Sequence, residues 1–544
     1  MAGFDYIIIG GGSSGCVIAA RLSEDPAVRV LLLEAGRRDN SILYHWPAGF
    51  ARMTKGIGSW GWSTVPQRHM QGRKLWYTQA KVIGGGSTIN AQIYTRGNRR
   101  DYDGWSEAGC DGWAYRDVLP YFKRAEGNER FSDDFHGSDG PLGVSMPRAT
   151  LPICDAFIRA GQEFGMPYNP DFNGARQAGV GYYQLTQRDV RRSSTAVAYL
   201  RNAEQRPNLS VRTGVTVRRI TVAQGRATGV ELLNGEVVAA EREVILASGA
   251  IGSPRLLLLS GIGPADHLRQ VGVPVVQDLP GVGQNLQDHV DLCVLAECTG
   301  PHSYDGVKRL DRTILAGLQY LLFKSGPVAA SLFETGGFWY ADSKAKSPDI
   351  QFHFGQGSGI EKGIATINGS GVTLNSALLR PRSRGTVQLG SSDPTAAPLI
   401  DPNYWSDPYD LEMSLKGLEM AREILRQPAL KPWLRAEMLP GPEVTSREAL
   451  FGYACRMAKT DHHPVGTCRM GDDDMAVVEP DLLLRGLAGL RVADASVMPN
   501  VPSSNTNAAA IMVGEKASDL IRGLPPLPAT VFAEQRNDRR RDLA

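Results

Sequence analysis

The residues best suited to chemistry near the start of the sequence are three glycines and one acid. Gly10, Gly12 and Gly15 follow an apolar run and open a segment typical of a helix. Glycines at these positions permit a tight turn, let a pyrophosphate approach the backbone and allow close helix–strand packing. Glu34 ends a second apolar run, where an acid accepts hydrogen bonds from a ribose. The pattern predicts a site for an adenine dinucleotide, nicotinamide or flavin, with its phosphates at the positive end of the helix.

A second group of reactive residues lies near the other end of the chain. Two of the nine histidines adjoin at His462 and His463. Histidine is the commonest side chain for removing a hydroxyl proton. A metal site that also uses Asp461 and Cys468 is an alternative, but the spacing matches no zinc pattern, and we expect no metal. The absence of a G-x-S-x-G motif disfavours an acyl hydrolase.

The apolar pattern predicts the elements that position these groups. Residues 4–9 and 28–33 are typical of buried parallel strands, joined by a helix over 13–22. Alternating strands follow between 209 and 233, and a buried strand at 243–247 returns to the first sheet. A further strand and an apolar helix close the sequence. We therefore expect a mixed α+β or α/β fold in which a Rossmann-like nucleotide domain is discontinuous and a second domain faces the substrate.

Composition restricts the class of protein. A net charge of +2, from 59 basic and 57 acidic residues, argues against a nucleic-acid partner. No apolar run approaches the roughly 20 residues of a membrane helix, and a strand that begins by Phe4 leaves no room for a signal peptide. Seven cysteines without a C-x-x-C pair suit reduced thiols. We expect a cytoplasmic protein of two or three domains, with peripheral membrane contact left open.

Longer blocks extend over nearly the whole chain. They are KVIGGGSTIN at 81–90, DYDGWSEAGCDGWAYRDVLPYFKRAE at 101–126, GAIGSPRLLLLSGIGP at 249–264, LPGVGQNLQDH at 279–289, HPVGTCRMG at 463–471, and residues 492–515. Together with the first glycine turn, they resemble the glucose–methanol–choline (GMC) family of flavoprotein oxidoreductases. Residues 168–174 and 191–200 are most similar to its choline-dehydrogenase-like branch, and closest to sorbose- and polyethylene-glycol-dehydrogenase-like members.

The resemblance implies FAD as the cofactor. Val217 would hold the adenine through its backbone, Val82 and Asn90 to Ile93 would lie along the flavin, and Asp494 and Ala495 would close over the pyrophosphate and ribityl chain. The implied cofactor-binding residues are Gly10, Gly12, Ser13, Ser14, Gly15, Glu34, Ala35, Val82, Gly85, Asn90, Ala91, Gln92, Ile93, Val217, Asp494 and Ala495.

Some relatives attach the flavin covalently through a histidine in the second glycine turn. This chain has Ile89 at that position. We therefore expect FAD to be bound non-covalently.

The resemblance also implies the catalytic residues. His463 heads the HPVGT block and would be the general base. The register back from the C-terminal helix puts Asn507 at the place of its partner, where an amide can hold the substrate oxygen. His462 is the alternative base. Because adjacent side chains of an extended segment point to opposite sides, we expect only one of the two histidines to face the flavin. Glu334 falls in a block that borders the substrate pocket, either as a contact for a cationic substrate or as a flavin-side or surface acid.

The order of predicted elements along the sequence, together with its composition, predicts the domain boundaries. They are residues 1–150, 206–300 and 457–525 for the FAD-binding domain, residues 151–205 and 301–456 for a substrate-binding domain whose antiparallel sheet is flanked by helices, and residues 526–544 for a disordered tail.

The predicted function is that of an FAD-dependent alcohol dehydrogenase. It would oxidise a primary or secondary CH–OH group of a small molecule to an aldehyde or ketone and pass the electrons to a quinone or another non-nicotinamide acceptor. The alternatives are an oxidase that converts O2 to H2O2, a lyase that keeps FAD as a structural group and a non-catalytic flavin-binding module. The second glycine turn and the C-terminal blocks disfavour a nicotinamide enzyme.

Overall fold

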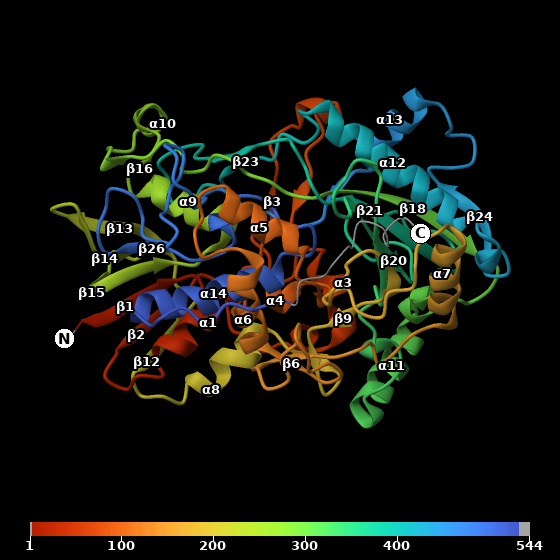
Figure 1. Ribbon diagram of the computed structural model, residues 1–544, viewed down its shortest axis with the longest axis horizontal. Coiled ribbons are helices and arrows are strands. Elements are labelled where there is room, and N and C mark those ends of the chain that lie inside the picture. The colour runs from red at the N-terminus through yellow and green to blue at the C-terminus, as the bar shows by residue number, and fades with distance from the viewer. Residues whose placement is uncertain (1–2, 533–544) are drawn as a thin grey trace.

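A computed structural model describes residues 3–532, and its first sheet is assembled from three distant parts of the chain (Figure 1). The strand order is β12 (Leu209–Thr213), β2 (Val30–Glu34), β1 (Phe4–Ile9), β15 (Val237–Leu246), β14 (Arg226–Leu232) and β13 (Val217–Ala223), with β26 (Leu490–Val492) beside β15. β12, β2, β1, β15 and β26 pair in parallel, whereas β13 to β15 form an antiparallel meander. The strands with continuous apolar runs, β1 and β2, pair in parallel and are buried along almost their whole length, as expected for strands covered on both faces.

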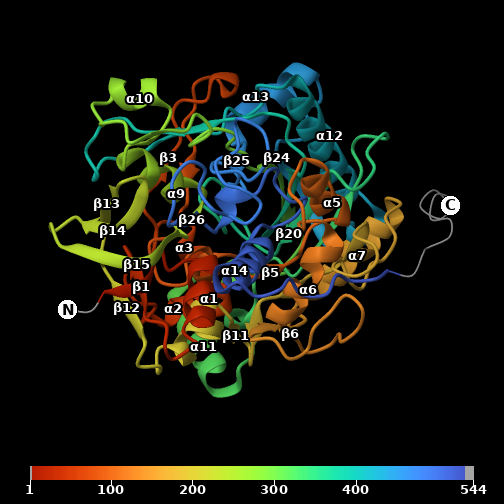
Figure 2. The ribbon, with the colours of Figure 1, turned by 60° about the vertical axis from the view of Figure 1, so that its left-hand side comes forward.

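Helices α1 (Ser13–Leu22) and α14 (Asn507–Arg522) pack together beside this sheet. Small residues let the two backbones approach, because a Cβ on Gly514 would lie 3.0 Å from the Cα of Ser14. The hydroxyl of Ser14 donates a hydrogen bond to the Ala510 carbonyl at 2.7 Å. The last helix of the chain thus covers the first, and the two ends of the sequence build one side of the nucleotide domain (Figures 1 and 2).

A second, antiparallel sheet lies at the other end of the molecule (Figure 1). Its order is β24 (Leu434–Leu439), β18 (Val290–Cys298), β21 (Gly371–Leu378), β20 (Ile350–Gly355), β19 (Thr335–Trp339) and β8 (Gly179–Tyr182), with β25 (Lys459–Thr460) beside β18. Helices α7 (Pro152–Glu163) and α12 (Pro408–Leu425) pack on it. Other helices used below are α4 (Gly86–Ile89), α6 (Tyr115–Ala125), α9 (Gly249–Leu259) and α11 (Leu310–Phe323).

This architecture confirms the predicted fold class. A discontinuous Rossmann-like sheet and an antiparallel sheet flanked by helices are both present. Among residues 3–532, no helix is long and apolar enough to cross a membrane.

The expected disordered tail needs a correction over its first residues. The Leu527 N–H donates to the Tyr121 hydroxyl at 3.2 Å, and the Thr530 N–H donates to the Arg116 carbonyl at 2.8 Å. Phe532 stacks on Tyr115, with the ring centroids 5.9 Å apart. Two backbone hydrogen bonds and the Phe532 ring thus fix this segment to α6. Residues 533–544 lie outside the described part of the chain.

Candidate active site

One cavity is lined by residues from both sheets. Gly10 follows β1 and Glu34 ends β2, whereas His353 and Asn375 lie on β20 and β21, and all four line this cavity. One end therefore lies at the carboxyl edge of the parallel strands, where open α/β sheets bind ligands. The other end lies against the antiparallel sheet.

The N-termini of three helices border the nucleotide end of the cavity. Their first positions follow Gly12 in α1, Ser248 in α9 and Thr506 in α14, and none of these N-cap residues makes a side-chain capping bond. The three caps line the cavity. Helix N-termini carry partial positive charge and free N–H groups, so their convergence suits a pyrophosphate.

The glycines of the first turn are required by the space around them. Gly10 has φ +103°, and a Cβ there would lie 2.5 Å from the Ala247 carbonyl oxygen. A Cβ on Gly15 would lie 1.9 Å from the Gly10 carbonyl oxygen. Gly15 therefore lies beneath the turn, where it lets the helix pack on the strand, and does not line the cavity. The residues present fit a dinucleotide.

Glu34 lies at the position expected for a ribose contact. Its carboxylate accepts hydrogen bonds from the Gly11 N–H at 2.8 Å and from the Gly36 N–H at 2.6 Å. Burial raises the pKa of this carboxyl to about 6. Each oxygen retains a second lone pair for a ligand hydroxyl.

Most residues predicted to bind the cofactor line the cavity. They are Gly10, Gly12, Ser13, Ser14, Glu34, Ala35, Gly85, Asn90, Ala91, Gln92, Ile93, Val217, Asp494 and Ala495. Val82 does not line it and packs in a small apolar cluster with Met53 and Ile89. Glu334 is also outside the cavity wall: its side chain folds back onto its own loop, where one oxygen accepts from the Leu332 N–H at 2.9 Å. This position does not favour the substrate-pocket role, which stays a prediction, and Glu361 is the glutamate that lines the cavity at that end.

The substrate end contains His463, which follows the short strand β25. The Asn505 amide nitrogen lies 3.2 Å from His463 Nε2. The amide oxygen of Asn505 accepts from the Thr95 hydroxyl at 3.1 Å and from the Gln351 amide at 3.0 Å. Because two donors fix that oxygen, the NH2 group of Asn505 faces the histidine, and His463 Nε2 accepts its hydrogen bond.

His289 fixes the other nitrogen of the same ring. His289 Nε2 lies 3.1 Å from the Leu379 carbonyl oxygen, which accepts only, so this nitrogen carries the proton. The other nitrogen, Nδ1, lies 3.0 Å from His463 Nδ1 and must accept in a neutral ring. His463 therefore carries its proton on Nδ1, and its single Nε2 lone pair accepts the Asn505 N–H.

Electrostatics keep this histidine neutral. Burial and the neighbouring imidazoles His289 and His353 hold the pKa of His463 well below its usual value. Burial also lowers the pKa of His289 to about 4. The carboxyl of Asp461, 3.4 Å from His463 Nδ1, has a pKa raised well above its usual value, first by burial. An uncharged imidazole whose Nε2 can exchange the Asn505 N–H for a substrate hydroxyl is a proton acceptor.

The two adjoining histidines, His462 and His463, both line the cavity. The expectation that only one of them faces the flavin stays a prediction. His462 has φ +63°, so the segment is not extended there and its side chains do not alternate. A non-glycine residue in the left-handed region beside a reactive group is a common sign of a functional site.

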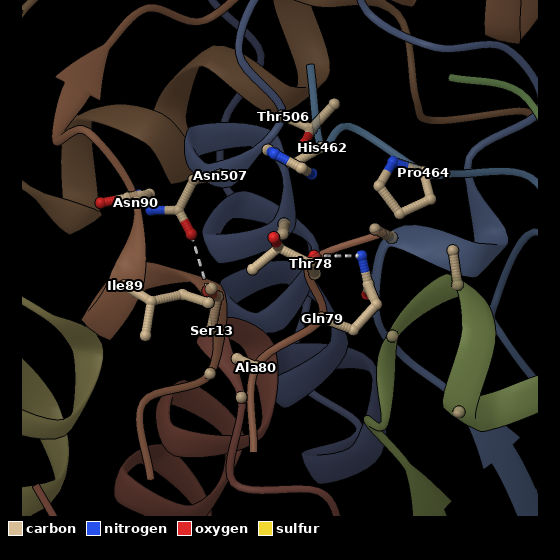
Figure 3. A pocket seen from close by; sticks show the side chains of 18 of the residues that line it. Ser13, Thr78, Gln79, Ala80, Ile89, Asn90, His462, Pro464, Thr506 and Asn507 are labelled. Atoms are coloured by element: carbon tan, nitrogen blue, oxygen red, sulfur yellow. Dashed lines mark hydrogen bonds between the residues drawn. The ribbon is translucent and has the colours of Figure 1, made fainter. Parts of the chain in front are cut away.

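The predicted partner of His463 also needs a correction. Asn507 begins helix α14, and its amide oxygen accepts from the Ser13 hydroxyl at 2.6 Å (Figure 3). That contact places it at the nucleotide end of the cavity. Asn505, two residues earlier in the loop before the helix, is the residue that contacts His463.

Several site residues were not identified from the sequence. Lys459 lies 2.6 Å from Asp291 and 2.9 Å from Glu361, and this ion-paired group borders the cavity. Asn505 lies in the C-terminal block and His289 ends the LPGVGQNLQDH block, so the blocks themselves were the available signal. Glu361 lies outside these blocks and carries no such signal. The pairing of β25 with β18 sets Asp291 beside Lys459, and Glu361 reaches that lysine from the segment between β20 and β21.

Two family models that describe GMC oxidoreductases match residues 4–291 and 381–514 of this chain. The chain is 40% identical over 527 residues to an alcohol dehydrogenase [acceptor] of Pseudomonas putida, covering 95% of each. It is 40% identical to the mitochondrial choline dehydrogenase of Homo sapiens, covering 96% of this chain and 90% of that one.

Solved structures give the same result. A pyridoxine 4-oxidase from Mesorbium loti has a TM-score of 0.87 at 32% identity, over 96% of this chain and 100% of the other. A formate oxidase of Aspergillus oryzae has a TM-score of 0.89 at 26% identity, over 96% and 98%. The match runs through the nucleotide cradle and the histidine segment alike, and the chain therefore belongs to the GMC oxidoreductase family, as an FAD-dependent oxidoreductase that acts on CH–OH donors.

Proposed function

We propose that the protein is an alcohol dehydrogenase that uses non-covalently bound FAD and passes electrons to a quinone or another non-nicotinamide acceptor. Relatives named for alcohol and for choline support a small CH–OH substrate. The observation that carries the proposal is the neutral His463 on the cavity wall, whose Nε2 accepts from the Asn505 amide.

The residues of this chain supply proton removal and orientation. His463 Nε2 accepts the hydroxyl proton of the alcohol, and the Asn505 amide donates to the alcohol oxygen and holds it toward that nitrogen. FAD, when bound, supplies the acceptor for the hydride that leaves the carbinol carbon. The hydrogen bond to His289 keeps His463 in the tautomer that this task requires.

The nucleotide end supports FAD that is held without a covalent bond. The helix N-termini of α1, α9 and α14 would bind the pyrophosphate, and Glu34 the ribose. Ile89, which lines the cavity in the second glycine turn, has no nucleophile to offer the flavin ring. Localisation in the cytoplasm stays a prediction, supported by seven cysteines that are all free and buried.

His463→Ala tests the proposal. The variant should lower kcat with an artificial dye by on the order of 10²–10⁴, because that range is usual for a general base. FAD content, measured in the supernatant after acid precipitation, should equal that of the wild type. His69→Ala, outside the cavity, is the matched control and should keep wild-type activity.

Three results would contradict the proposal. Near-normal turnover by His463→Ala would exclude the histidine as the base. Yellow colour that stays with the acid-precipitated pellet would exclude non-covalent attachment. Turnover under air that equals turnover with the dye, with production of H2O2, would make the protein an oxidase.

A further inference from the structure

Helix α11 (Leu310–Phe323) turns an apolar face to solvent. Of its residues only Ala316 and Tyr320 are buried. Leu310, Ile314, Leu318 and Leu321 follow helical spacing, so they form one stripe along the helix. The exposed fractions of the apolar side chains are 77% for Leu310, 55% for Ile314, 64% for Leu315, 49% for Leu318, 56% for Leu321, 72% for Leu322 and 72% for Phe323. An exposed apolar surface of this kind marks an interaction site.

The opposite face of α11 is fixed to the protein. The Tyr320 hydroxyl donates to the Val190 carbonyl at 2.6 Å, and its ring meets that of Trp46 edge-on, with the centroids 5.5 Å apart. The helix projects from the lower edge of the molecule in both views (Figures 1 and 2). The outward direction of the apolar stripe is therefore set by packing.

Basic residues flank the apolar stripe. Residues 308–324 contain four basic side chains, Lys308, Arg309, Arg312 and Lys324, and one acidic side chain, Asp311. Lys308 is ion-paired with Asp305 and Arg309 with Asp311, whereas Arg312 and Lys324 have no carboxylate partner among the described residues. An apolar face between basic ends matches an anionic phospholipid surface, which accepts apolar side chains below its headgroups and attracts cations at them. A symmetric contact with a second copy of α11 would bring these like charges together, which disfavours self-association.

The helix is connected to the cavity by packed apolar residues. The 3-10 helix η5 (Pro327–Ala329) packs on α11 and on η1 (Pro47–Gly49). Phe50, which follows η1, lines the cavity and packs against Phe333, another lining residue, with the ring centroids 5.9 Å apart. The surface that carries α11 is thus continuous with one wall of the cavity.

We propose that α11 docks the protein on an anionic membrane surface, with its leucines inserted among the lipids and its basic ends at the headgroups. The docked enzyme would draw its electron acceptor, a lipid-dissolved quinone, from that membrane. This second part rests on the proposed function. In the overall reaction the alcohol loses two electrons and two protons and becomes a carbonyl compound, and the quinone gains both and becomes a quinol.

The docking is tested by flotation of the FAD-loaded full chain with vesicles of equal parts phosphatidylcholine and phosphatidylglycerol. The wild type should float with these vesicles and less with phosphatidylcholine alone. The triple variant Leu318→Ser, Leu321→Ser, Leu322→Ser should lower the bound fraction about tenfold or more, because three apolar side chains leave the lipid. The matched control Val237→Ser, Val276→Ser, Leu399→Ser alters exposed apolar residues elsewhere and should float like the wild type.

The outcomes separate docking from chemistry. A wild type that stays with the soluble fraction, or a triple variant that floats like the wild type, would overturn the docking. A lipid-free dimer that the triple variant dissociates, without vesicle binding by the wild type, would make the face a contact between copies. If the floated wild type reduces a water-soluble dye but not a short-chain benzoquinone in the vesicles, the quinone part fails alone. If it reduces neither, the proposed function fails, and the docking result still stands.

Discussion

At the scale of single residues, the site depends on a chain of hydrogen bonds that fixes the tautomer of His463 and leaves its Nε2 as an acceptor, which Asn505 contacts. Leu379 fixes the proton of His289, and His289 fixes that of His463. Asn505 is oriented independently by Thr95 and Gln351. The sequence block identified His463, but counting back from the apolar helix selected Asn507. The helix begins at that residue, whose side chain turns to Ser13, and the contact to His463 comes from the preceding loop.

The two asparagines should therefore behave differently when replaced. Asn505→Ala removes a donor to the substrate oxygen and should lower kcat/KM by about 10- to 100-fold, as expected for about 1–3 kcal/mol of hydrogen bonding. Asn507→Ala removes the bond to Ser13 and should raise the Kd for FAD by about fivefold, with little change of kcat at saturating FAD. Steady-state kinetics and FAD titration measure both effects.

Asn368→Ala, at an exposed loop position, is the control for these two variants and should match the wild type in both assays. A large loss of kcat in Asn507→Ala with normal FAD affinity, and no loss in Asn505→Ala, would show that Asn507 and not Asn505 is the partner of His463.

At the scale of elements, local sequence patterns were sufficient for the nucleotide domain. The strand over 4–9 and the helix over 13–22 were predicted with the bounds that the structure has, because an apolar run, glycines and a helical period act within a few residues of each other. The segment around Glu334 could not be predicted in the same way. The direction in which the Glu334 side chain points depends on the backbone at Leu332, which has φ +71°, and on the pairing of β19 with β20 and β8.

The buried position of Glu334 predicts a pH-dependent stability. Burial raises the pKa of its carboxyl to about 7 in the folded protein. The pKa of Glu334 in the folded protein lies above its value in the unfolded chain. The contribution of this carboxyl to the free energy of unfolding is therefore fully present below the unfolded-state pKa and is lost as the pH rises through the folded-state pKa. Relative to the wild type, Glu334→Gln should gain up to about 3 kcal/mol of unfolding free energy as the pH rises from about 4.5 to above 7.

Thermal unfolding of both proteins across this pH range measures the difference. The exposed Glu443→Gln is the control and should show no pH-dependent gain. Because Glu334 lies off the cavity wall, kcat/KM of Glu334→Gln should stay within about twofold of the wild type, a change of less than about 0.5 kcal/mol. A large loss of activity in Glu334→Gln, without the pH-dependent gain in unfolding free energy, would show that Glu334 acts in the substrate site.

At the scale of the whole molecule, the chemistry lies where two sheets meet. The nucleotide end comes from strand ends and helix starts near positions 10, 34 and 249, and the substrate end comes from β20, β21 and the segment after β25. The sequence predicted the members of the first group, since each belongs to a local motif. The ion-paired cluster around Lys459 could not be predicted, because it is created by strand pairing over long separations. The apolar face of α11 is likewise recognisable only when the structure shows that no described element covers it.

The central claim is that an alcohol reduces the bound flavin with the help of His463. It is tested most directly by mixing the FAD-loaded wild type with a series of primary and secondary alcohols under anaerobic conditions and recording the yellow absorbance in a stopped-flow instrument. At least one alcohol should bleach the flavin in a single turnover without any added acceptor, and His463→Ala should bleach slower by on the order of 10²–10⁴. Persistent yellow colour with every alcohol, or equal bleaching rates in the two proteins, would contradict it.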